Sequence, residues 1–204
     1  MISEAIRTDV ISNNVANVNT TGYKKDEAIN SDFASVLWKR INDGEVQEVG
    51  KLGRGTVVAE VVVSQSQGAV RKTDNDFDLA IDGKGFFVVD TPQGERYTRN
   101  GSFLRSANGE LVTSDGYKVM GTAGVITVDE NAKFTVSPTG EIIVDDVPTD
   151  NLRLVDFAEN VKLEKEGSTL FKAPNGATPT DSTATIVQGS IEMSNVNVVG
   201  EMVK

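Results

Sequence analysis

The chain has 204 residues, with 20 basic and 30 acidic side chains and a formal net charge of −10. Such an acidic chain is a poor ligand for nucleic acid or anionic lipid, because both are bound through clustered Lys and Arg. It contains no cysteine and no histidine, which excludes disulfides, thiolate metal sites and the usual general base near neutral pH. We therefore expect no catalytic residue, no metal site, no cofactor, no small-molecule substrate and no nucleic-acid partner.

The sequence gives no sign of membrane insertion or of a cleavable leader. No segment approaches the roughly 20 consecutive apolar residues that a membrane helix needs. The first nine residues carry Glu4 and Asp9, where a signal peptide has positive charge followed by a hydrophobic run. We expect a chain that stays in the cytosol or leaves it by a route that reads no cleavable signal.

Residues 1 to about 19 are predicted to form a helix, because their apolar residues recur at helical spacing. The polar face is rich in Asn, Ser and Thr, which are mediocre helix formers, so this helix needs a surface to pack on. Gly22 suits the left-handed residue that follows a helix end. The apolar stripe is Ile2, Ala5, Ile6, Val10, Ile11, Val15 and Val18.

The next 25 residues have a weaker pattern. Phe33, Val36, Leu37 and Ile41 suggest a second short helix or a partly ordered arm, and Asp43-Gly44 interrupts it.

From about Gly55 the period changes to that of strands, beginning with the β-branched run 56–63. Strand-like segments then recur every eight to twelve residues as far as Val155, and Asn100-Gly101, Asn108-Gly109 and Asp115-Gly116 are two-residue hairpin signals. This spacing predicts a mainly β fold, an antiparallel β-sandwich or barrel-like central domain with short α-helical N- and C-terminal segments. The aromatic residues in strand contexts are expected in its core: Phe86, Phe87, Tyr97 and Phe103.

The C-terminal part combines a loop, a strand and the start of a helix. Residues 173–185 are small and polar and predict a loop, and residues 186–193 predict a last strand. Ser194-Asn195-Val196-Asn197 supplies two candidate N-caps for a helix whose apolar stripe continues to the last residues, so the chain is expected to be cut within an element. The predicted division is a helical assembly segment (1–40), a connecting arm with the first strands (41–75), a β-rich central domain (76–187) and a C-terminal segment that starts a truncated helix (188–204).

Three features that imitate chemical sites have simpler explanations. Asp74-Asn75-Asp76 resembles a calcium loop, but an EF-hand would need Gly at position 79 and Glu at 85, where the chain has Leu79 and Gly85. Gly83-Lys84-Gly85 lacks the spacing of a phosphate loop and leads into a strand. A carboxylate pair at glycosidase distance is possible by number of acids alone, and nothing marks one pair.

Three ordered segments together resemble the bacterial flagellar basal-body rod and hook proteins. The first is Asp9–Lys24, with the sequence DVISNNVANVNTTGYK. The second runs from Ser66 through Asp78–Val89 and continues in Tyr97–Phe103 and Gly109–Thr113. The third is GSIEMSNVNVV, Gly189–Val199. The modest length between the first and last segments resembles the rod proteins rather than the hook protein, and leaves the proximal and distal rod types open.

The resemblance implies a structural subunit that leaves the cytoplasm through the flagellar type III export apparatus and polymerises helically on the axial structure of the basal body, in the periplasm or across the cell wall. Its partners would be copies of itself, neighbouring rod and hook proteins and the export apparatus. Its terminal helices would pair inside the tube, with the β domain outside. The implied assembly interface is Ile2, Ile6, Val10, Ile11, Asn13, Asn14, Asn17, Val18, Asn195, Val196, Asn197, Val198, Val199 and Met202.

Two departures from the family pattern accompany the resemblance. Family members usually begin with further helical residues before Asp9 and continue for several turns after Val199, so a chain trimmed at both termini is expected, monomeric or weakly associating. Gly200 stands where the family commonly carries an acidic residue, at a cost of about 1 kcal/mol of helix propensity relative to Ala.

Two other classes of function stay open at this stage. An extracellular binding domain or adhesin on the same β body would carry a ligand site on its surface and would not depend on the termini. A hydrolase built on carboxylates alone is the third hypothesis. The asparagine-rich first segment favours the rod protein, because neither alternative requires it.

Overall fold

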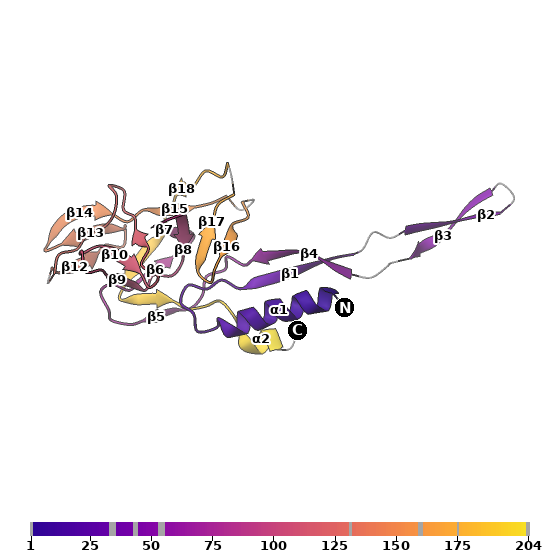
Figure 1. The fold of residues 1–204 in the computed structure, drawn as a ribbon, viewed down its shortest axis with the longest axis horizontal. Helices are drawn as coiled ribbons and strands as arrows, with labels where there is room; N and C mark the ends of the chain where they lie inside the picture. The colour runs from indigo at the N-terminus through magenta and orange to yellow at the C-terminus, as the bar shows by residue number, and fades with distance from the viewer. Residues whose placement is uncertain are drawn as a thin grey trace.

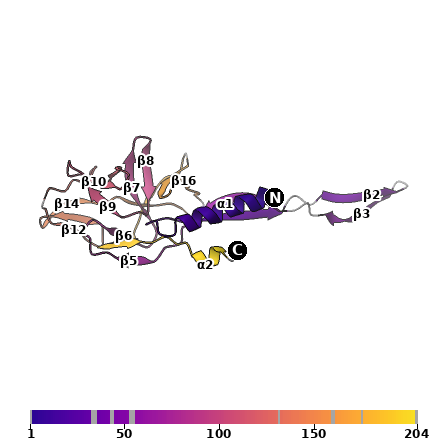
Figure 2. The same ribbon diagram turned by 60° about the horizontal axis from the view of Figure 1, so that its bottom comes forward.

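The molecule divides into a β body and an end region from which a long hairpin extends (Figures 1 and 2). The computed structural model describes residues 2–32, 36–42, 45–52, 56–130, 132–158, 161–174 and 176–202. Within these residues the chain is mainly β, with antiparallel pairing throughout and two short helices, as predicted; the sheets are open and none closes into a barrel.

The end region consists of two helices and a two-stranded ribbon. Helix α1 (Ile2–Ala16) lies along the ribbon formed by β1 (Asp26–Asp32) and β4 (Thr56–Val63), and α2 (Val198–Met202) contacts α1. The two helices lie side by side in both ribbon views (Figures 1 and 2). The helix predicted over residues 1–19 is therefore confirmed, and it has the packing surface that its composition requires.

The second short helix predicted after residue 26 is wrong where the structure describes it. Strand β2 (Val36–Asn42) pairs antiparallel with β3 (Glu45–Leu52), and Asn42 stands opposite Glu45. The intervening sequence is Asp-Gly, the strong two-residue hairpin signal, and it outweighs the helical spacing of Val36, Leu37 and Ile41. Phe33, the first residue of that prediction, lies outside the described residues.

The largest sheet of the described body is centred on β7 (Phe86–Thr91). One edge of β7 pairs with β8, and the other pairs with β15 and then with β11. The remaining strands extend the sheet outward in the order β16-β17-β8-β7-β11-β10-β9, with β18 beside β15. Their bounds are β8 (Gly94–Thr98), β9 (Phe103–Arg105), β10 (Leu111–Thr113), β11 (Lys118–Val119), β15 (Leu154–Asp156), β16 (Glu164–Glu166), β17 (Leu170–Lys172) and β18 (Thr180–Asp181).

Smaller sheets complete the body and lead to the end region. The predicted last strand is two strands that pair with different partners, β19 with β6 and β20 with β5, because Gly189 between them turns the chain with a φ of 69°. A three-stranded sheet has the order β12-β13-β14. The bounds are β5 (Val70–Lys72), β6 (Leu79–Asp82), β12 (Phe134–Val136), β13 (Glu141–Val144), β14 (Val147–Asn151), β19 (Thr185–Gln188) and β20 (Ser190–Glu192).

The body has two hydrophobic clusters, one on each side of β7. Phe87 and Val89 point into the larger cluster, and Phe86 and Val88 point into the smaller one. A strand that is buried on both faces has a continuous apolar sequence rather than an alternating one, as the run Phe-Phe-Val-Val has here. All four aromatic residues predicted for the core are buried: Phe86, Phe87, Tyr97 and Phe103.

Two of the three predicted hairpin turns are present. Asn108-Gly109 joins the paired strands β9 and β10, and Asp115-Gly116 joins β10 and β11, with left-handed φ angles of 81° and 84° at the glycines. Asn100-Gly101 does not close a hairpin, because β8 and β9 take other partners. Gly101 instead allows close packing, since a Cβ there would lie 1.6 Å from the carbonyl oxygen of Leu79.

Candidate functional site

The end region and the body meet at a polar junction, which we define as Tyr23, Lys24, Arg99, Lys165 and Glu192. Tyr23 and Lys24 follow α1, Arg99 follows β8, Lys165 is in β16, and Glu192 ends β20. These side chains bring together segments that are up to 168 residues apart in the sequence.

Glu192 is the centre of a buried ion cluster. The Nζ atom of Lys24 lies 2.6 Å from one oxygen of the Glu192 carboxylate, and Nη1 of Arg99 lies 3.2 Å from the other. The exposed fractions of the three side chains are 1%, 0% and 4% for Lys24, Glu192 and Arg99. Burial lowers the pKa of both Lys24 and Arg99, and the negative charge of Glu192 opposes that shift in each case.

Main-chain groups supply further hydrogen bonds to this cluster, although the buried Nε of Arg99 has no partner among the described residues. The N–H of Gly68 donates to the same Glu192 oxygen as Lys24, at 2.8 Å. Lys24 also donates to the carbonyl of Ser66 at 2.8 Å, and Nη2 of Arg99 donates to the carbonyl of Gly83 at 2.7 Å. Buried charges are tolerated only when paired and hydrogen-bonded in this way. The cluster therefore fixes where the two terminal segments cross the body.

Lys165 attaches the body to the segment after α1. Its Nζ donates to the carbonyl of Lys24 at 2.7 Å and lies 3.1 Å from the carboxylate of Asp26. The same atom lies 3.7 Å from the ring centroid of Tyr23, a cation–π contact. Burial lowers the pKa of Lys165, and burial, aided by Asp26, raises the pKa of the Tyr23 hydroxyl.

Asn14 fastens α1 to β1. Its side-chain amide donates to the carbonyl of Asp26 at 2.8 Å, and its Oδ1 accepts from the N–H of Asp26 at 2.9 Å and from the hydroxyl of Tyr23 at 3.2 Å. The side chain thus pairs with a strand residue as a neighbouring backbone would. It is fully buried, so its hydrogen bonds are made inside the chain.

Asn195 attaches the C-terminal segment in a similar way, through hydrogen bonds between its side chain and backbone groups. Its Oδ1 accepts from the N–H of Lys25 at 2.7 Å, and its amide donates to the carbonyls of Ser64 and Ser66 at 3.1 and 3.0 Å. Asn197 is an N-cap, as predicted, because its Oδ1 accepts from the N–H of Gly200 at 3.1 Å.

Close backbone approach at the junction requires glycine. Gly22 has the predicted left-handed conformation, with a φ of 69°, and its N–H donates to the carbonyl of Glu192 at 2.8 Å. A Cβ on Gly22 would lie 2.3 Å from the nitrogen of Asn100. Both its conformation and its contact with the body therefore exclude a side chain.

The residues predicted as the assembly interface fall into three groups. Asn14 and Val196 are buried, and Ile2 begins α1. Partly exposed are Ile6, Val10, Ile11, Asn17, Val18, Asn195 and Val198. Exposed are Asn13, Asn197, Val199 and Met202, and the last two are 73% and 70% exposed. The structure places these residues on α1 and α2 and on the segments that directly follow α1 and precede α2, and whether they form an interface stays a prediction.

The sequence did not identify the charged residues of the junction as buried. Lys24, Arg99 and Glu192 lie inside the segments that carry the family resemblance, but a lone charge in such a segment is ordinarily a surface residue. The available signal was their position among apolar or small residues, as in Ser190-Ile191-Glu192-Met193. Lys165 stands between two glutamates in an exposed-looking strand and gave no signal.

Two kinds of feature are absent from the residues that the structure describes. These residues contain no cluster of three or more acidic side chains that could hold a metal ion. Among them no helix is long and apolar enough to cross a membrane. Asp74, the first residue of the sequence that imitates a calcium loop, has a left-handed φ of 60° and an exposed ion pair with Lys72.

Comparison with known proteins agrees with this architecture. Residues 80–144 match the family described as flagellar hook protein FlgE/F/G D1 domain, and residues 1–24 match flagella basal body rod protein. The chain is 33% identical to the flagellar basal-body rod protein FlgG of Buchnera aphidicola subsp. Schizaphis graminum, over 98% of this chain and 84% of that protein.

Two further relatives have similar coverage. The flagellar basal-body rod protein FlgG of Bacillus subtilis is 34% identical over 96% of this chain and 81% of the relative. The flagellar basal-body rod protein FlgF of Caulobacter vibrioides is 34% identical over 96% of this chain and 79% of the relative. With a matching β body, a matching first segment and relatives aligned along nearly its whole length, this chain belongs to the flagellar basal-body rod proteins and is a structural subunit of the rod.

Proposed function

We propose that the chain polymerises helically into the axial drive-shaft of the flagellum, and that its two terminal segments form the assembly interface. The observation that carries this proposal is the exposure of Val199 and Met202 on α2, beside the partly exposed apolar residues of α1. Monomeric proteins rarely leave such residues together at the surface without a partner for them. The buried junction supports the proposal as well, because it holds both segments in one fixed position relative to the body.

The partners that follow are other copies of the chain and neighbouring rod and hook proteins. The segment 1–40 would carry assembly contacts, 41–75 would connect, 76–187 would form the outer body, and 188–204 would complete the interface. A subunit of this kind has a mechanical role, and we assign it no catalysis. It would act in the axial structure that crosses the periplasm or the cell wall.

Export through the flagellar type III apparatus, without a cleavable signal peptide, completes the proposal. The absence of cysteine supports it, because a disulfide would obstruct an unfolded chain during threading. The junction is compatible with unfolded transport, since it consists of noncovalent contacts that form again when the remote segments meet.

Sedimentation velocity over a concentration series tests the assembly interface. Of the two expected states, monomeric or weakly associating, the proposal requires the second. The sedimentation coefficient of the unmodified chain should therefore rise with concentration, and Val199→Glu combined with Met202→Glu should abolish this rise. Leu104→Glu is the matched control, because Leu104 is a similarly exposed apolar residue on the body and its charge should leave association unchanged. A chain that stays monomeric at every concentration would contradict the proposal, and so would equal effects of both substitutions.

A further inference from the structure

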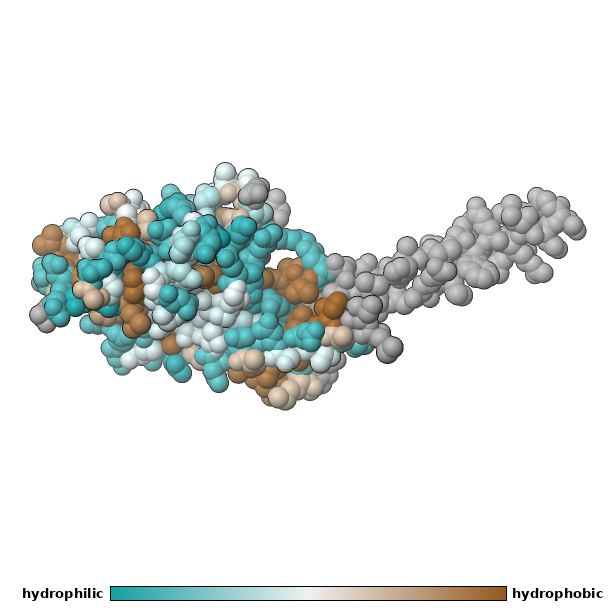
Figure 3. Space-filling model, viewed as in Figure 1, coloured by the Kyte–Doolittle hydropathy of each residue, from teal (hydrophilic) through white to brown (hydrophobic). Residues whose placement is uncertain are grey.

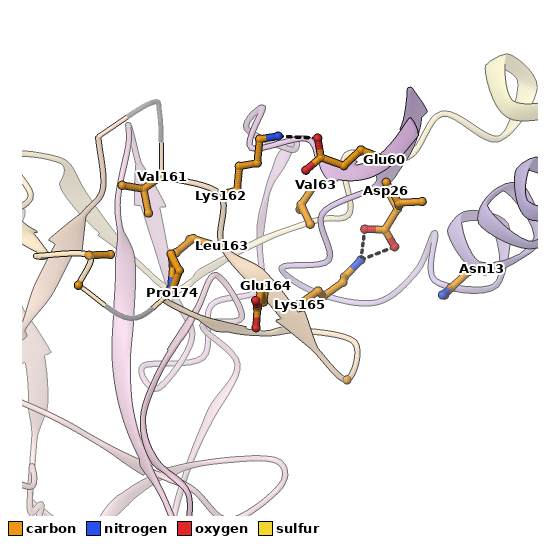
Figure 4. Close-up of a pocket in the computed structure, with 14 residues that line it drawn as sticks. Asn13, Asp26, Glu60, Val63, Val161, Lys162, Leu163, Glu164, Lys165 and Pro174 are labelled. Atoms are coloured by element: carbon orange, nitrogen blue, oxygen red, sulfur yellow. Dashed lines mark hydrogen bonds and ion pairs between the residues drawn. The ribbon is translucent and has the colours of Figure 1, made fainter. Parts of the chain in front are cut away.

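A groove lies between the ribbon of the end region and the body, with one residue of α1 in its lining. It has a volume of about 960 Å³. Its lining includes Asn13 of α1, Val61 and Val63 of β4, and Leu163 and Lys165 of the body. Figure 4 shows all of these residues except Val61 with labels. No residue of α2 lines it. The groove is therefore separate from the contact that α2 makes with α1.

Val61 and Val63 form an apolar strip within the groove. In the antiparallel ribbon Val61 is opposite Ala28, and Val63 is opposite Asp26. Directly opposed residues of two strands share a face of the sheet. Val61 therefore shares a face of the ribbon with Val63, and 45% of Val61 is exposed. Figure 3 shows hydrophobic atoms, in brown, at the surface of the end region.

The charges at the rim limit what the groove can bind. Lys162 is paired with Glu60, and Lys165 is paired with Asp26 (Figure 4). Both lysines of the groove are thus neutralised within the chain, which makes it a poor anion site. Glu164 adds a further carboxylate to the lining. The two valines between these charges fit the apolar face of a helix, as in helix-in-groove recognition.

The chain itself carries a matching apolar projection. Val199 and Met202 are three residues apart on α2, and side chains at this spacing lie on one face of a helix. They are the most exposed large apolar side chains of the described residues. A projection and a recess at different places on one chain give a heterologous contact, which repeats head to tail without closing.

We propose that α2 of a second copy docks in this groove, with Val199 and Met202 of that copy against Val61 and Val63. This inference rests on the proposed self-assembly and specifies which surfaces meet. The groove is continuous with the proposed interface, because Asn13 of α1 belongs to both. The contact polarises the assembly, since each copy offers its groove to one neighbour and its α2 to the next.

Complementation of two variants tests the polarity of the contact. Val61→Glu blocks the groove and keeps α2, whereas Met202→Glu blocks α2 and keeps the groove. Each variant alone should sediment as a monomer where the unmodified chain forms larger species. An equimolar mixture should form a species no larger than a heterodimer, because only one groove and one α2 remain competent. Unimpaired association of either variant alone would overturn the inference and leave self-assembly intact.

Cross-linking provides a second readout that also detects weak contacts. The chain has no cysteine, so an introduced thiol is the only one. A mixture of Val61→Cys and Met202→Cys should give a disulfide-linked dimer under mild oxidation at a yield at least several-fold above that of Val147→Cys mixed with Met202→Cys. Val147 is the control because it is exposed and belongs to β14, which lies at the end of the body away from the helices (Figure 1). Equal yields would overturn the docking proposal, whereas failure of self-assembly would appear separately as a monomeric unmodified chain.

Discussion

The β body and the end region are stabilised in different ways. In the body, β7 is covered on both faces by apolar side chains, and its aromatic residues make contacts such as the edge-to-face pair of Phe87 and Phe103 at 5.1 Å. In the end region, buried ions and asparagine side chains attach the helices, and large apolar residues remain exposed. Apolar packing is sufficient to stabilise the body, which is complete within one chain. The end region keeps apolar surface for a partner and is positioned by polar contacts.

The largest effect is expected in the body. Phe87→Ala should lower the free energy of unfolding by about 4 kcal/mol, because it removes a fully buried ring from the larger cluster. Urea unfolding followed by circular dichroism measures this change. Leu104→Ala, at a site that is 53% exposed, should change the value by less than about 0.5 kcal/mol. Similar losses in the two variants would mean that the core does not have the arrangement described.

A buried charge should have the next largest effect. Glu192→Gln leaves Lys24 and Arg99 buried without their counter-charge, which should cost about 3 kcal/mol at neutral pH. Hydrogen exchange should accelerate at the backbone amides of residues 14–26 while β7 stays protected, since Phe87 and its neighbours are untouched. Glu110→Gln, at the partly exposed pair with Lys118, is the control and should cost less than about 1 kcal/mol. Uniform acceleration along the chain would show that the junction and the body unfold together.

The asparagine attachment of α1 should have a smaller effect. Asn14→Ala leaves the N–H and the carbonyl of Asp26 without these partners and should cost about 1–3 kcal/mol. Asn17→Ala is the matched control just after the helix, because the Asn17 side chain bonds only within its own segment, to Asn13 and Thr20. Hydrogen exchange of the α1 amides measures the difference, as the ratio of the exchange rate in each variant to that in the unmodified chain. Equal ratios would contradict a specific role for Asn14.

The smallest effect concerns pH. Burial raises the pKa of Tyr23, so the folded state keeps the hydroxyl protonated above about pH 10, where the unfolded chain ionises it. The contribution of this group to stability is therefore present below pH 10 and is lost as the pH rises further. The stability advantage of the unmodified chain over Tyr23→Phe, about 1 kcal/mol from the bond to Asn14, should shrink between pH 9 and pH 11. If the difference in unfolding free energy between the two chains, measured in urea, stays constant over this range, the raised pKa of Tyr23 is refuted.

The sequence by itself determined the elements whose signals are local. Helical spacing over residues 1–19, the β-branched run 56–63, the apolar run of β7 and the turn glycines Gly22, Gly109 and Gly116 each depend on neighbours within a few residues. Local spacing failed for residues 36–42, where pairing with β3 overrode a weak helical pattern. The segment 124–128, which has a strand pattern, makes only isolated bridges at Val125 and Thr127.

Only the tertiary structure decided which polar residues are buried. Lys24 and Glu192 are 168 positions apart, and no pattern near either residue indicates the other. The family resemblance places Asn14 in the assembly interface along with Asn13 and Asn17, and in the structure the strand beside α1 takes its hydrogen bonds. A charged or amide side chain is stable in the interior only when its partners are in place, and those partners come from remote segments. The sequence thus established the family and the elements, and the fold established the junction and the groove.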